Sequence, residues 1–325
     1  MDTYNFLYTS DYNYFSHTLT SIYSLILNNQ NINCTIHIIE DEFSENEYKK
    51  LYDLEKIFRN VNIKIYSINK LKSINEYYNI PKWRNTNIPN ARLFFSEIIK
   101  NIDKIMYIDS DTIIVNNLKQ AFIGDTIYPV CLVKEIYVPS HLKENLNNYY
   151  NTGVILFDYK KWVQDSFRIF DIIKTMECKL VFPDQDILNL AMEDNIGTMD
   201  ASYNIYPPIQ ILMKYPYLAH KKLEKTTNFY SYEEIKKAIE NPHIYHSYGV
   251  LYGRFWDNNK INPFNSIYEQ YRTIWDSSFI REDNEEIINK IKIIPFLNTV
   301  LSVYMSEYSY EKAKIFIKKN ILKKK

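Results

Sequence analysis

The stretch ARLFFSEIIKNIDKIMYIDSDTIIV, residues 91–115, holds a helical pattern, a strand pattern and two carboxylates in succession. Residues 91–99 read as a helix, and the apolar run at 104–108 reads as a buried strand. That strand leads directly into Asp109 and Asp111. Helices that alternate with apolar strands build a parallel sheet covered by helices. The stretch therefore predicts the fold, and it raises the question of what two charges do at the end of a buried strand.

The segments before and after this stretch repeat the alternation. Ser44 and Glu47 form a potential capping box that opens a helix through Phe58. Helical spacing recurs at 16–29, at 160–178 and in DQDILNLAMED (184–194), and strands are expected at 4–10, 34–40, 61–68, 127–136 and 153–159. We expect an α/β fold: a Rossmann-like, mostly parallel central sheet flanked by helices.

The character of the chain changes near residue 276. Beyond it, short helical patterns follow one another without strands between them. We therefore expect one domain over 1–275 and a short C-terminal helical extension with a basic tail over 276–325.

Composition narrows the class of protein. The 325 residues include 39 basic and 39 acidic side chains, and a neutral chain offers no global attraction for nucleic acid, so that partner is disfavoured. Three widely spaced cysteines form no CxxC pair, which favours a reducing compartment. The first residues resemble no signal peptide, and no apolar run has the length of a membrane helix. These features predict a cytoplasmic protein.

The two carboxylates after the strand indicate a ligand site. In an open parallel sheet, ligands gather outside the carboxyl ends of the strands. If the chain stays extended there, the Asp109 and Asp111 side chains share a face. Carboxylates so close repel one another unless a cation lies between them, and oxygen ligands suit Mg²⁺ or Mn²⁺ bridging to phosphates.

A DxD tripeptide alone leaves three interpretations open. It fits a solvated strand end, the nucleophile and general acid of a haloacid-dehalogenase-type phosphatase, or a metal clamp for a nucleotide sugar. The phosphatase motif normally follows the first strand, whereas here three strands precede it and no GDxxxD sequence follows. The phosphatase is therefore the weaker of the two enzyme interpretations.

Companion motifs favour the nucleotide-sugar interpretation. They run in order as FLYTSDYNY, NARLFFSEII, MYIDSDTIIVNNL, YYNTGVILFDYKKW, FPDQDILNLA and HSYG, and they span residues 4 to about 265. In this order and spacing the chain resembles glycosyltransferase family 8, which includes glycogenin and bacterial lipopolysaccharide galactosyl- and glucosyltransferases. The resemblance implies a GT-A fold and a UDP-sugar-dependent hexosyltransferase.

The resemblance also implies roles for individual residues. Asp109, Asp111 and His246 would bind Mn²⁺ or Mg²⁺, while Asp184 and Gln185 would reach the transferred sugar and its anomeric face as the catalytic residues. Uracil and ribose would lie on the loop after the first strand, with Tyr14 as the stacking ring. The full nucleotide-sugar set implied is Thr9, Asp11, Asn13, Tyr14, Arg92, Asp109, Ser110, Asn151, Gly153, Asp184, Gln185, Gly249 and Arg254. Asp186 is expected to support its loop or cap the helix.

One segment departs from the family pattern. The family commonly reads HxxGxxKPW, whose Lys neutralises the departing diphosphate, but here HSYGVLYGRFW (246–256) places Tyr252 at that position. We expect Arg254, two residues further on, to supply the charge.

The implied reaction is retaining transfer of a hexose, from UDP-glucose or UDP-galactose, to a glycan, glycolipid or glycoprotein acceptor. The departure at Tyr252 keeps a second function open, a non-catalytic sugar-nucleotide-binding assembly partner of the same fold. The tail KAKIFIKKNILKKK (312–325) is basic and amphipathic. Two interpretations of it stay level: a solvated terminal helix, or a peripheral contact with the inner face of the plasma membrane.

Overall fold

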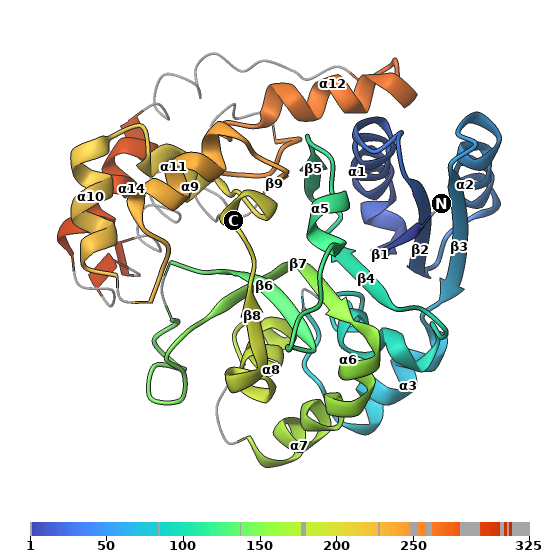
Figure 1. Cartoon of the computed structure of the whole chain (residues 1–325), viewed down its shortest axis with the longest axis horizontal. Helices are drawn as coiled ribbons and strands as arrows, with labels where there is room; N and C mark the ends of the chain where they lie inside the picture. The colour runs from blue at the N-terminus through green and yellow to red at the C-terminus, as the bar shows by residue number, and fades with distance from the viewer. Residues whose placement is uncertain are drawn as a thin grey trace. The chain divides into compact units, whose positions relative to one another are not determined.

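Figure 1 shows the computed structural model of the chain, which describes residues 2–83, 85–136, 138–176, 180–226, 228–247, 252–257, 262–279, 293–305, 309–310 and 312–313. The chain divides into two units. The first comprises Met1–Ser110 with Ile114–Asp200, and the second comprises Asp111–Ile113 with Ala201–Lys325. The boundary expected at residue 276 follows the end of α12 (Asn265–Trp275) and stays a prediction.

The first unit is built on a seven-stranded sheet with the order β3-β2-β1-β4-β7-β6-β8. Strand β7 runs antiparallel to both of its neighbours, and the other neighbouring strands are parallel, so the sheet is mostly parallel as expected. The strands are β1 (Thr3–Asp11), β2 (Asn33–Asp41), β3 (Val61–Ser67), β4 (Lys104–Ile108), β6 (Val130–Lys134), β7 (Tyr150–Asp158) and β8 (Ile196–Thr198).

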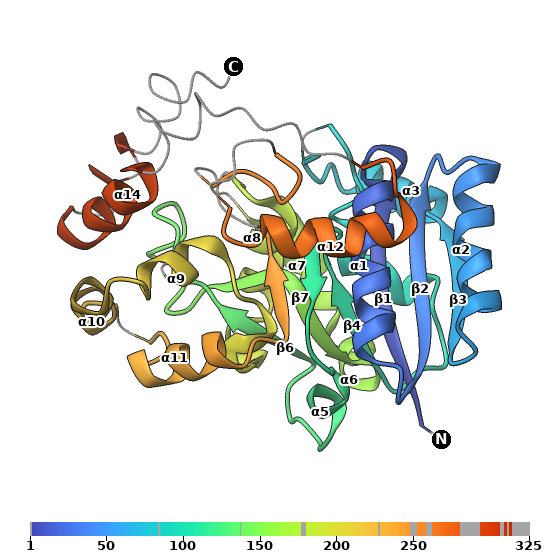
Figure 2. The same cartoon turned by 90° about the horizontal axis from the view of Figure 1, so that it is seen from above.

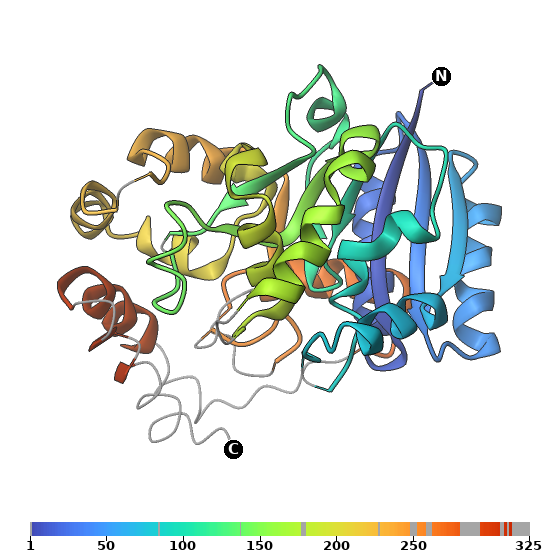
Figure 3. The ribbon, with the colours of Figure 1, turned by 90° about the horizontal axis from the view of Figure 1, so that it is seen from below.

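Helices cover both faces of this sheet. Helix α1 (Phe15–Asn28) lies on one face (Figure 2), and α3 (Asn69–Tyr77), α6 (Tyr159–Asp165) and α7 (Phe167–Thr175) lie on the other (Figure 3). Further helices of the unit are α2 (Glu45–Ile57), α4 (Ala91–Phe94), α5 (Lys119–Phe122) and α8 (Pro183–Ala191). Short 3₁₀ turns occupy Tyr12–Tyr14, Phe95–Glu97 and Glu193–Asn195.

The core under the second face joins strand and helix residues in one cluster. Tyr107 and Phe157 of the sheet belong to the same buried cluster as Phe95, Trp162 and Ile187. Phe95 stacks on Trp162 with ring centroids 6.3 Å apart and lies 4.8 Å from the ring of Phe157. Burial of these side chains holds β4, β7 and α8 together, and Asp184 and Gln185 lie on α8.

Two of the expected helices are divided. The segment 91–99 forms α4 and then the 3₁₀ turn Phe95–Glu97. Phe94 packs on Phe170 while the next residue, Phe95, packs on Phe157, so both rings face the core at the point where the α-helix tightens into the 3₁₀ turn. The helix expected over 160–178 breaks at Ser166 into α6 and α7.

The sequence-based expectation is an extended chain through the DxD motif, and this expectation is wrong. Strand β4 ends at Ile108, and Ser110 and Asp111 form a turn before β5 (Thr112–Ile114). The buried Ser110 hydroxyl donates to the Thr9 carbonyl at 3.2 Å and accepts from the Thr18 hydroxyl at 2.7 Å. These hydrogen bonds hold the turn, and the turn rather than strand pleating sets the direction of the two carboxylates.

The second unit is mainly helical. Strand β9 (Ile244–His246) pairs with β5 in a two-stranded sheet. Its helices are α9 (Pro207–Leu212), α10 (Pro216–Glu224), α11 (Tyr232–Glu240), α12 and α14 (Ile293–Tyr304), with a 3₁₀ turn at Ala201–Tyr203. Prolines at the first turns of α9 and α10 fix where these helices begin. Cys178, Gly249 and the basic segment 314–325 lie outside the described residues.

Candidate active site

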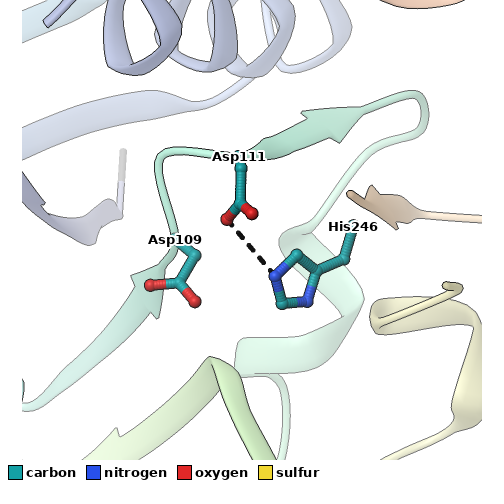
Figure 4. Close-up of side chains that lie close together, drawn as sticks. All are labelled: Asp109, Asp111 and His246. Carbon is teal, nitrogen blue, oxygen red and sulfur yellow. Dashed lines mark ion pairs between the residues drawn. The ribbon is translucent and has the colours of Figure 1, made fainter. Parts of the chain in front are cut away.

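Three potential metal ligands come together after β4. Asp109 follows β4, Asp111 lies in the next turn, and His246 ends β9. Their ligand atoms all lie within 4.8 Å of one another (Figure 4). Two carboxylates offer the oxygen donors that Mn²⁺ and Mg²⁺ sites use, and an imidazole is a common ligand of transition metals, so the donor set fits a divalent ion and suits Mn²⁺ better than Mg²⁺.

Backbone hydrogen bonds fix this arrangement. The Asp109 amide donates to the Gly153 carbonyl at 2.8 Å, which extends the pairing of β4 with β7. The Ser247 amide donates to the Asp111 carbonyl at 2.8 Å. Each carboxylate is therefore placed by its own main chain rather than by packing of the side chain alone.

The orientation of His246 suits a ligand. Its Nδ1 donates to Oδ1 of Asn204 at 3.0 Å, so in the neutral imidazole Nε2 is the atom with a lone pair. That Nε2 lies 3.3 Å from Oδ1 of Asp111 (Figure 4). In metal-binding histidines, a hydrogen bond from the ring nitrogen that does not bind the metal fixes the tautomer and the ring orientation, and the bond from Nδ1 to Asn204 can serve this purpose.

Arg92 is the centre of a buried charge network. Its guanidinium lies 2.9 Å from Oδ1 of Asp109 and 3.3 Å from Oδ2 of Asp184, and its side chain is only 6% exposed. Burial alone would lower the pKa of Arg92, but the two carboxylates raise it above its ordinary value, so the guanidinium stays charged. The network holds a cation directly beside the candidate metal ligand Asp109.

Tyr107 completes the surroundings of Arg92. The guanidinium carbon lies 4.3 Å from the centre of the Tyr107 ring, and the phenol donates to Oδ1 of Asp109. Burial raises the pKa of Tyr107 well above its ordinary value, so this phenol remains a donor. Tyr107 therefore orients the carboxylate that the sequence assigned to the metal.

Asp184 and Gln185 lie at the N-terminal turn of α8 and contact one residue of β7. The Thr152 hydroxyl lies 3.1 Å from Oδ2 of Asp184 and 3.3 Å from Oε1 of Gln185, and the Thr152 amide donates to the same Oε1 at 3.1 Å. The Thr152 carbonyl accepts from Arg92 at 2.7 Å. Burial raises the pKa of Asp184 above its ordinary value, although Arg92 opposes that shift. Thr152 thus links both predicted catalytic residues to Arg92.

The other predicted residues of β7 and α8 are also buried near this network. Asn151 donates to Glu135 at 2.7 Å and accepts from the Gly153 amide at 2.9 Å. Asp186 accepts from the backbone amides of Val181 and Phe182 at 2.8 and 3.0 Å. The expectation that Asp186 supports its loop is confirmed.

The predicted nucleotide-binding residues at the end of β1 and in the turn after it contact one another and their neighbours. The Asp11 carboxylate accepts from the Tyr14 amide at 3.0 Å and so caps the 3₁₀ turn, in which Asn13 is exposed. The Tyr14 ring is partly buried and lies edge-on to His17. The buried Thr9 hydroxyl lies 3.2 Å from the Tyr107 phenol. Thr9 thus hydrogen-bonds to Tyr107 of β4 and to Ser110 of the DxD turn, and contact with a nucleotide by any residue of this loop stays a prediction.

The residue at the family's Lys position is a core residue. Tyr252 is 2% exposed, so its ring takes part in packing. Arg254 forms an ion pair with Oδ2 of Asp111, and its Nη1 donates to the Ser247 carbonyl at 3.4 Å. The Arg254 charge, which is expected from the sequence to lie near a diphosphate, is therefore paired with the candidate metal ligand Asp111 in this structure.

Three residues of this arrangement were not predicted from the sequence: Tyr107, Thr152 and Asn204. Thr152 lies between Asn151 and Gly153, both of which belong to a quoted motif, and that position was the available signal. Tyr107 also lies in a quoted motif, MYIDSDTIIVNNL, but nothing there distinguishes it from the other 29 of the 30 tyrosines, and Asn204 lies 42 residues from His246 and outside every quoted motif.

The fold is the GT-A fold, which the solved structures of two glycosyltransferases share. The structure of the galactosyltransferase LgtC, solved with donor and acceptor sugar analogues, superposes with a TM-score of 0.65 at 17% identity, covering 86% of this chain and 98% of that one. The bifunctional glycosyltransferase WbbM superposes with a TM-score of 0.66 at 20% identity, covering 85% and 51%.

The sequence then gives the family. A sequence model of glycosyl transferase family 8 matches residues 5–259, and the chain belongs to this family. It is 27% identical over 225 residues to a lipopolysaccharide 1,2-glucosyltransferase of Escherichia coli strain K12, covering 65% of this chain and 64% of the relative. It is 24% identical over 269 residues to glycosyltransferase GlyF of Streptococcus pneumoniae serotype 4, covering 81% and 60%. The chain thus spans 60–64% of the length of these curated relatives.

Proposed function

We propose that the protein is a retaining, metal-dependent hexosyltransferase that moves a hexose from a UDP-sugar to a glycan, lipid-linked or protein-linked acceptor. The observation that carries the proposal is the group Asp109, Asp111 and His246, with ligand atoms within 4.8 Å of one another, in a family 8 chain. The relatives described as glucosyl- and galactosyltransferases favour UDP-glucose or UDP-galactose as the donor.

The metal would be held by Asp109, Asp111 and His246, and it would supply Lewis-acid neutralisation of the departing diphosphate. Asp109 enters this role already oriented by Tyr107 and Arg92. His246 enters it with its tautomer fixed by Asn204. Charges that are already in place before bond cleavage cost no reorganisation during the reaction, and in many enzymes they are the largest single contribution to stabilising the transition state.

Gln185 and Asp184 would face the sugar. An amide is a poor nucleophile, so the acceptor hydroxyl is expected to attack from the face that UDP leaves, with a UDP phosphate oxygen as the base. In this scheme the Gln185 oxygen, held by Thr152, orients the sugar and stabilises charge at its anomeric carbon. The buried Asp184 binds a sugar hydroxyl.

The test is release of UDP from UDP-glucose and UDP-galactose, measured with Mn²⁺ and with EDTA. Asp111→Asn keeps the shape of the side chain but removes its charge, so we expect turnover to fall at least about 100-fold. Asp276→Asn is the matched control. Asp276 forms an ion pair with Arg272 at 2.8 Å and is not one of the three candidate metal ligands, so this substitution should leave turnover unchanged. Near-normal turnover of Asp111→Asn would falsify the metal-dependent mechanism.

A second candidate, a non-catalytic sugar-nucleotide-binding partner, is favoured by two observations. The family's Lys position holds the buried Tyr252, and Arg254 is engaged with Asp111. Binding of UDP-sugar without release of UDP, in the presence of Mn²⁺ and a panel of acceptors, would support this candidate over the transferase. Phosphate release from simple monoesters would instead support the phosphatase.

A further inference from the structure

Arg254 occupies a position that the proposed metal also needs. Its guanidinium pairs with Oδ2 of Asp111, while Oδ1 of the same carboxylate lies 3.3 Å from Nε2 of His246. Both oxygens of Asp111 are therefore already directed at nitrogen atoms of these two side chains. A divalent ion bound by Asp111 and His246 would meet the guanidinium at very short range, and like charges at that range repel strongly.

The backbone of Arg254 is anchored, whereas its side chain is not enclosed. The Arg254 amide donates to Oδ2 of Asp257 at 2.9 Å, and the Gly253 carbonyl accepts from Asn262 at 3.0 Å. Gly253 has a φ of 72°, in the left-handed region that favours glycine, directly before Arg254. The Arg254 side chain is 28% exposed, against 10% for Asp111 and 5% for His246. A long side chain on a fixed stem can reorient without moving the backbone.

We propose that Arg254 is the counter-ion of Asp111 in the metal-free protein and that a divalent metal displaces it. The displaced guanidinium then becomes available to the anionic diphosphate of the donor. This is a positioning role that couples the two ligands: metal binding must break the Arg254–Asp111 pair, and donor binding uses the released charge. The metal would bind before the donor, and loss of Arg254 would change metal affinity and donor affinity in opposite directions.

The proposal rests on the metal site of the proposed function, and it is tested by binding rather than by activity. Mn²⁺ alone is titrated into the full chain, with free Mn²⁺ followed by electron paramagnetic resonance. We expect Arg254→Gln to bind Mn²⁺ at least about 5-fold more tightly than the wild type, which is the lower end of usual coupling factors, because the competing cation is gone. With Mn²⁺ saturating, the same variant should bind UDP at least about 5-fold more weakly.

Two further variants complete the titration. Arg254→Lys keeps a charge without the planar fork and should bind Mn²⁺ with an affinity between those of the wild type and Arg254→Gln. Arg272→Gln is the matched control, because Arg272 pairs with Asp276, which is outside the ligand group. Mn²⁺ affinity of Arg254→Gln equal to or weaker than that of the wild type overturns the proposal, as does an equal change in Arg272→Gln.

A measurement on the unaltered chain guards against a variant that fails to fold. Arginine modification by phenylglyoxal is followed at Arg254 by mass spectrometry. We expect Mn²⁺ to speed modification of Arg254 several-fold, and UDP added with Mn²⁺ to suppress it, while Arg272 stays constant. A rate that Mn²⁺ leaves unchanged or lowers contradicts the displacement. If the wild type turns over UDP-sugar with Mn²⁺ but shows neither effect, only this inference fails; if it binds no Mn²⁺, the metal site of the proposed function fails as well.

Discussion

Thr152 shows how one small side chain places two catalytic candidates. Its hydroxyl lies within 3.3 Å of both the Asp184 and Gln185 oxygens, and its carbonyl accepts from Arg92. Thr152→Val keeps the shape of the side chain and removes the hydroxyl. We expect kcat for UDP release to fall about 10-fold, because hydrogen bonds to a charged group are worth about 1.5–3 kcal/mol and part of that orients Asp184 and Gln185.

The readouts separate positioning from general destabilisation. Thr152 lies outside the metal ligand group, so Mn²⁺ affinity of Thr152→Val should match the wild type. Thr175→Val on α7 is the control, since the Thr175 hydroxyl bonds only a carbonyl of its own helix, that of Asp171 at 2.7 Å, among the contacts described. An unchanged kcat in Thr152→Val shows that the Thr152 amide alone suffices to hold Gln185.

At this scale the sequence identified residue types better than it identified partners. Asp109, Asp111 and His246 were found because the motif order marks them, and the structure brings their ligand atoms together. That Arg254 pairs with Asp111 could not be predicted, because the contact joins residues 143 positions apart through a turn whose geometry has no local signature. The sequence pattern places Tyr107 in a buried strand but does not predict that its hydroxyl contacts Asp109.

At the scale of elements, local signals predicted helix starts well. The capping box at α2 is present: the Ser44 amide donates to Oε2 of Glu47 at 2.9 Å, and the Ser44 hydroxyl accepts from the Asn46 amide at 3.3 Å. Ser44→Ala removes the side-chain half of this box. We expect the free energy of unfolding to fall by about 1 kcal/mol, measured by urea denaturation at pH 7.

The second capping box supplies the control for this prediction. Ser231 and Glu234 form the same motif at the start of α11, in the other unit. Ser231→Ala should cost a similar amount in a transition that reports the second unit, and Ser44→Ala should not shift that transition. A loss below about 0.3 kcal/mol for Ser44→Ala indicates that water replaces the cap without cost.

Elements whose ends depend on tertiary packing were predicted less well. The helix expected over 91–99 becomes α4 and a 3₁₀ turn, which meet at Phe94 and Phe95, and the rings of both residues pack into the core. The turn in the DxD segment is held by the buried Ser110 hydroxyl, which accepts a hydrogen bond from Thr18 and donates one to the Thr9 carbonyl. Neither event follows from period or propensity, which describe one element at a time.

At the scale of the whole molecule, the alternation of strands and helices predicted the sheet that the structure has. The antiparallel strand β7 was not anticipated, and it is the strand that brings Thr152 and Gly153 beside β4. Among the described residues, no helix is both long enough and apolar enough to cross a membrane. Contact of the basic tail with a membrane surface stays a prediction from sequence.

One buried histidine makes the stability of the first unit depend on pH. His37 lies in β2 and is 1% exposed, with Nδ1 3.1 Å from the Tyr66 phenol and Nε2 3.2 Å from Oδ1 of Asn5. Burial, with a smaller contribution from Lys64, lowers the pKa of His37 from 6.5 to about 4. As pH falls, the unfolded chain binds the proton first. The contribution of His37 to stability is therefore complete above pH 6.5 and is lost progressively toward pH 4.

Replacement of His37 tests this dependence directly. The full difference between the two pKa values corresponds to roughly 3 kcal/mol, of which about 2 kcal/mol should be lost between pH 7.5 and pH 5. His37→Gln can hydrogen-bond Asn5 and Tyr66 but cannot take up a proton, so its free energy of unfolding in urea should change about 2 kcal/mol less than the wild type over that interval. The exposed His220 on α10 provides the control, and His220→Gln should keep the wild-type dependence. If the free energy of unfolding of His37→Gln falls with decreasing pH as steeply as that of the wild type, the acid sensitivity arises from the carboxylates instead.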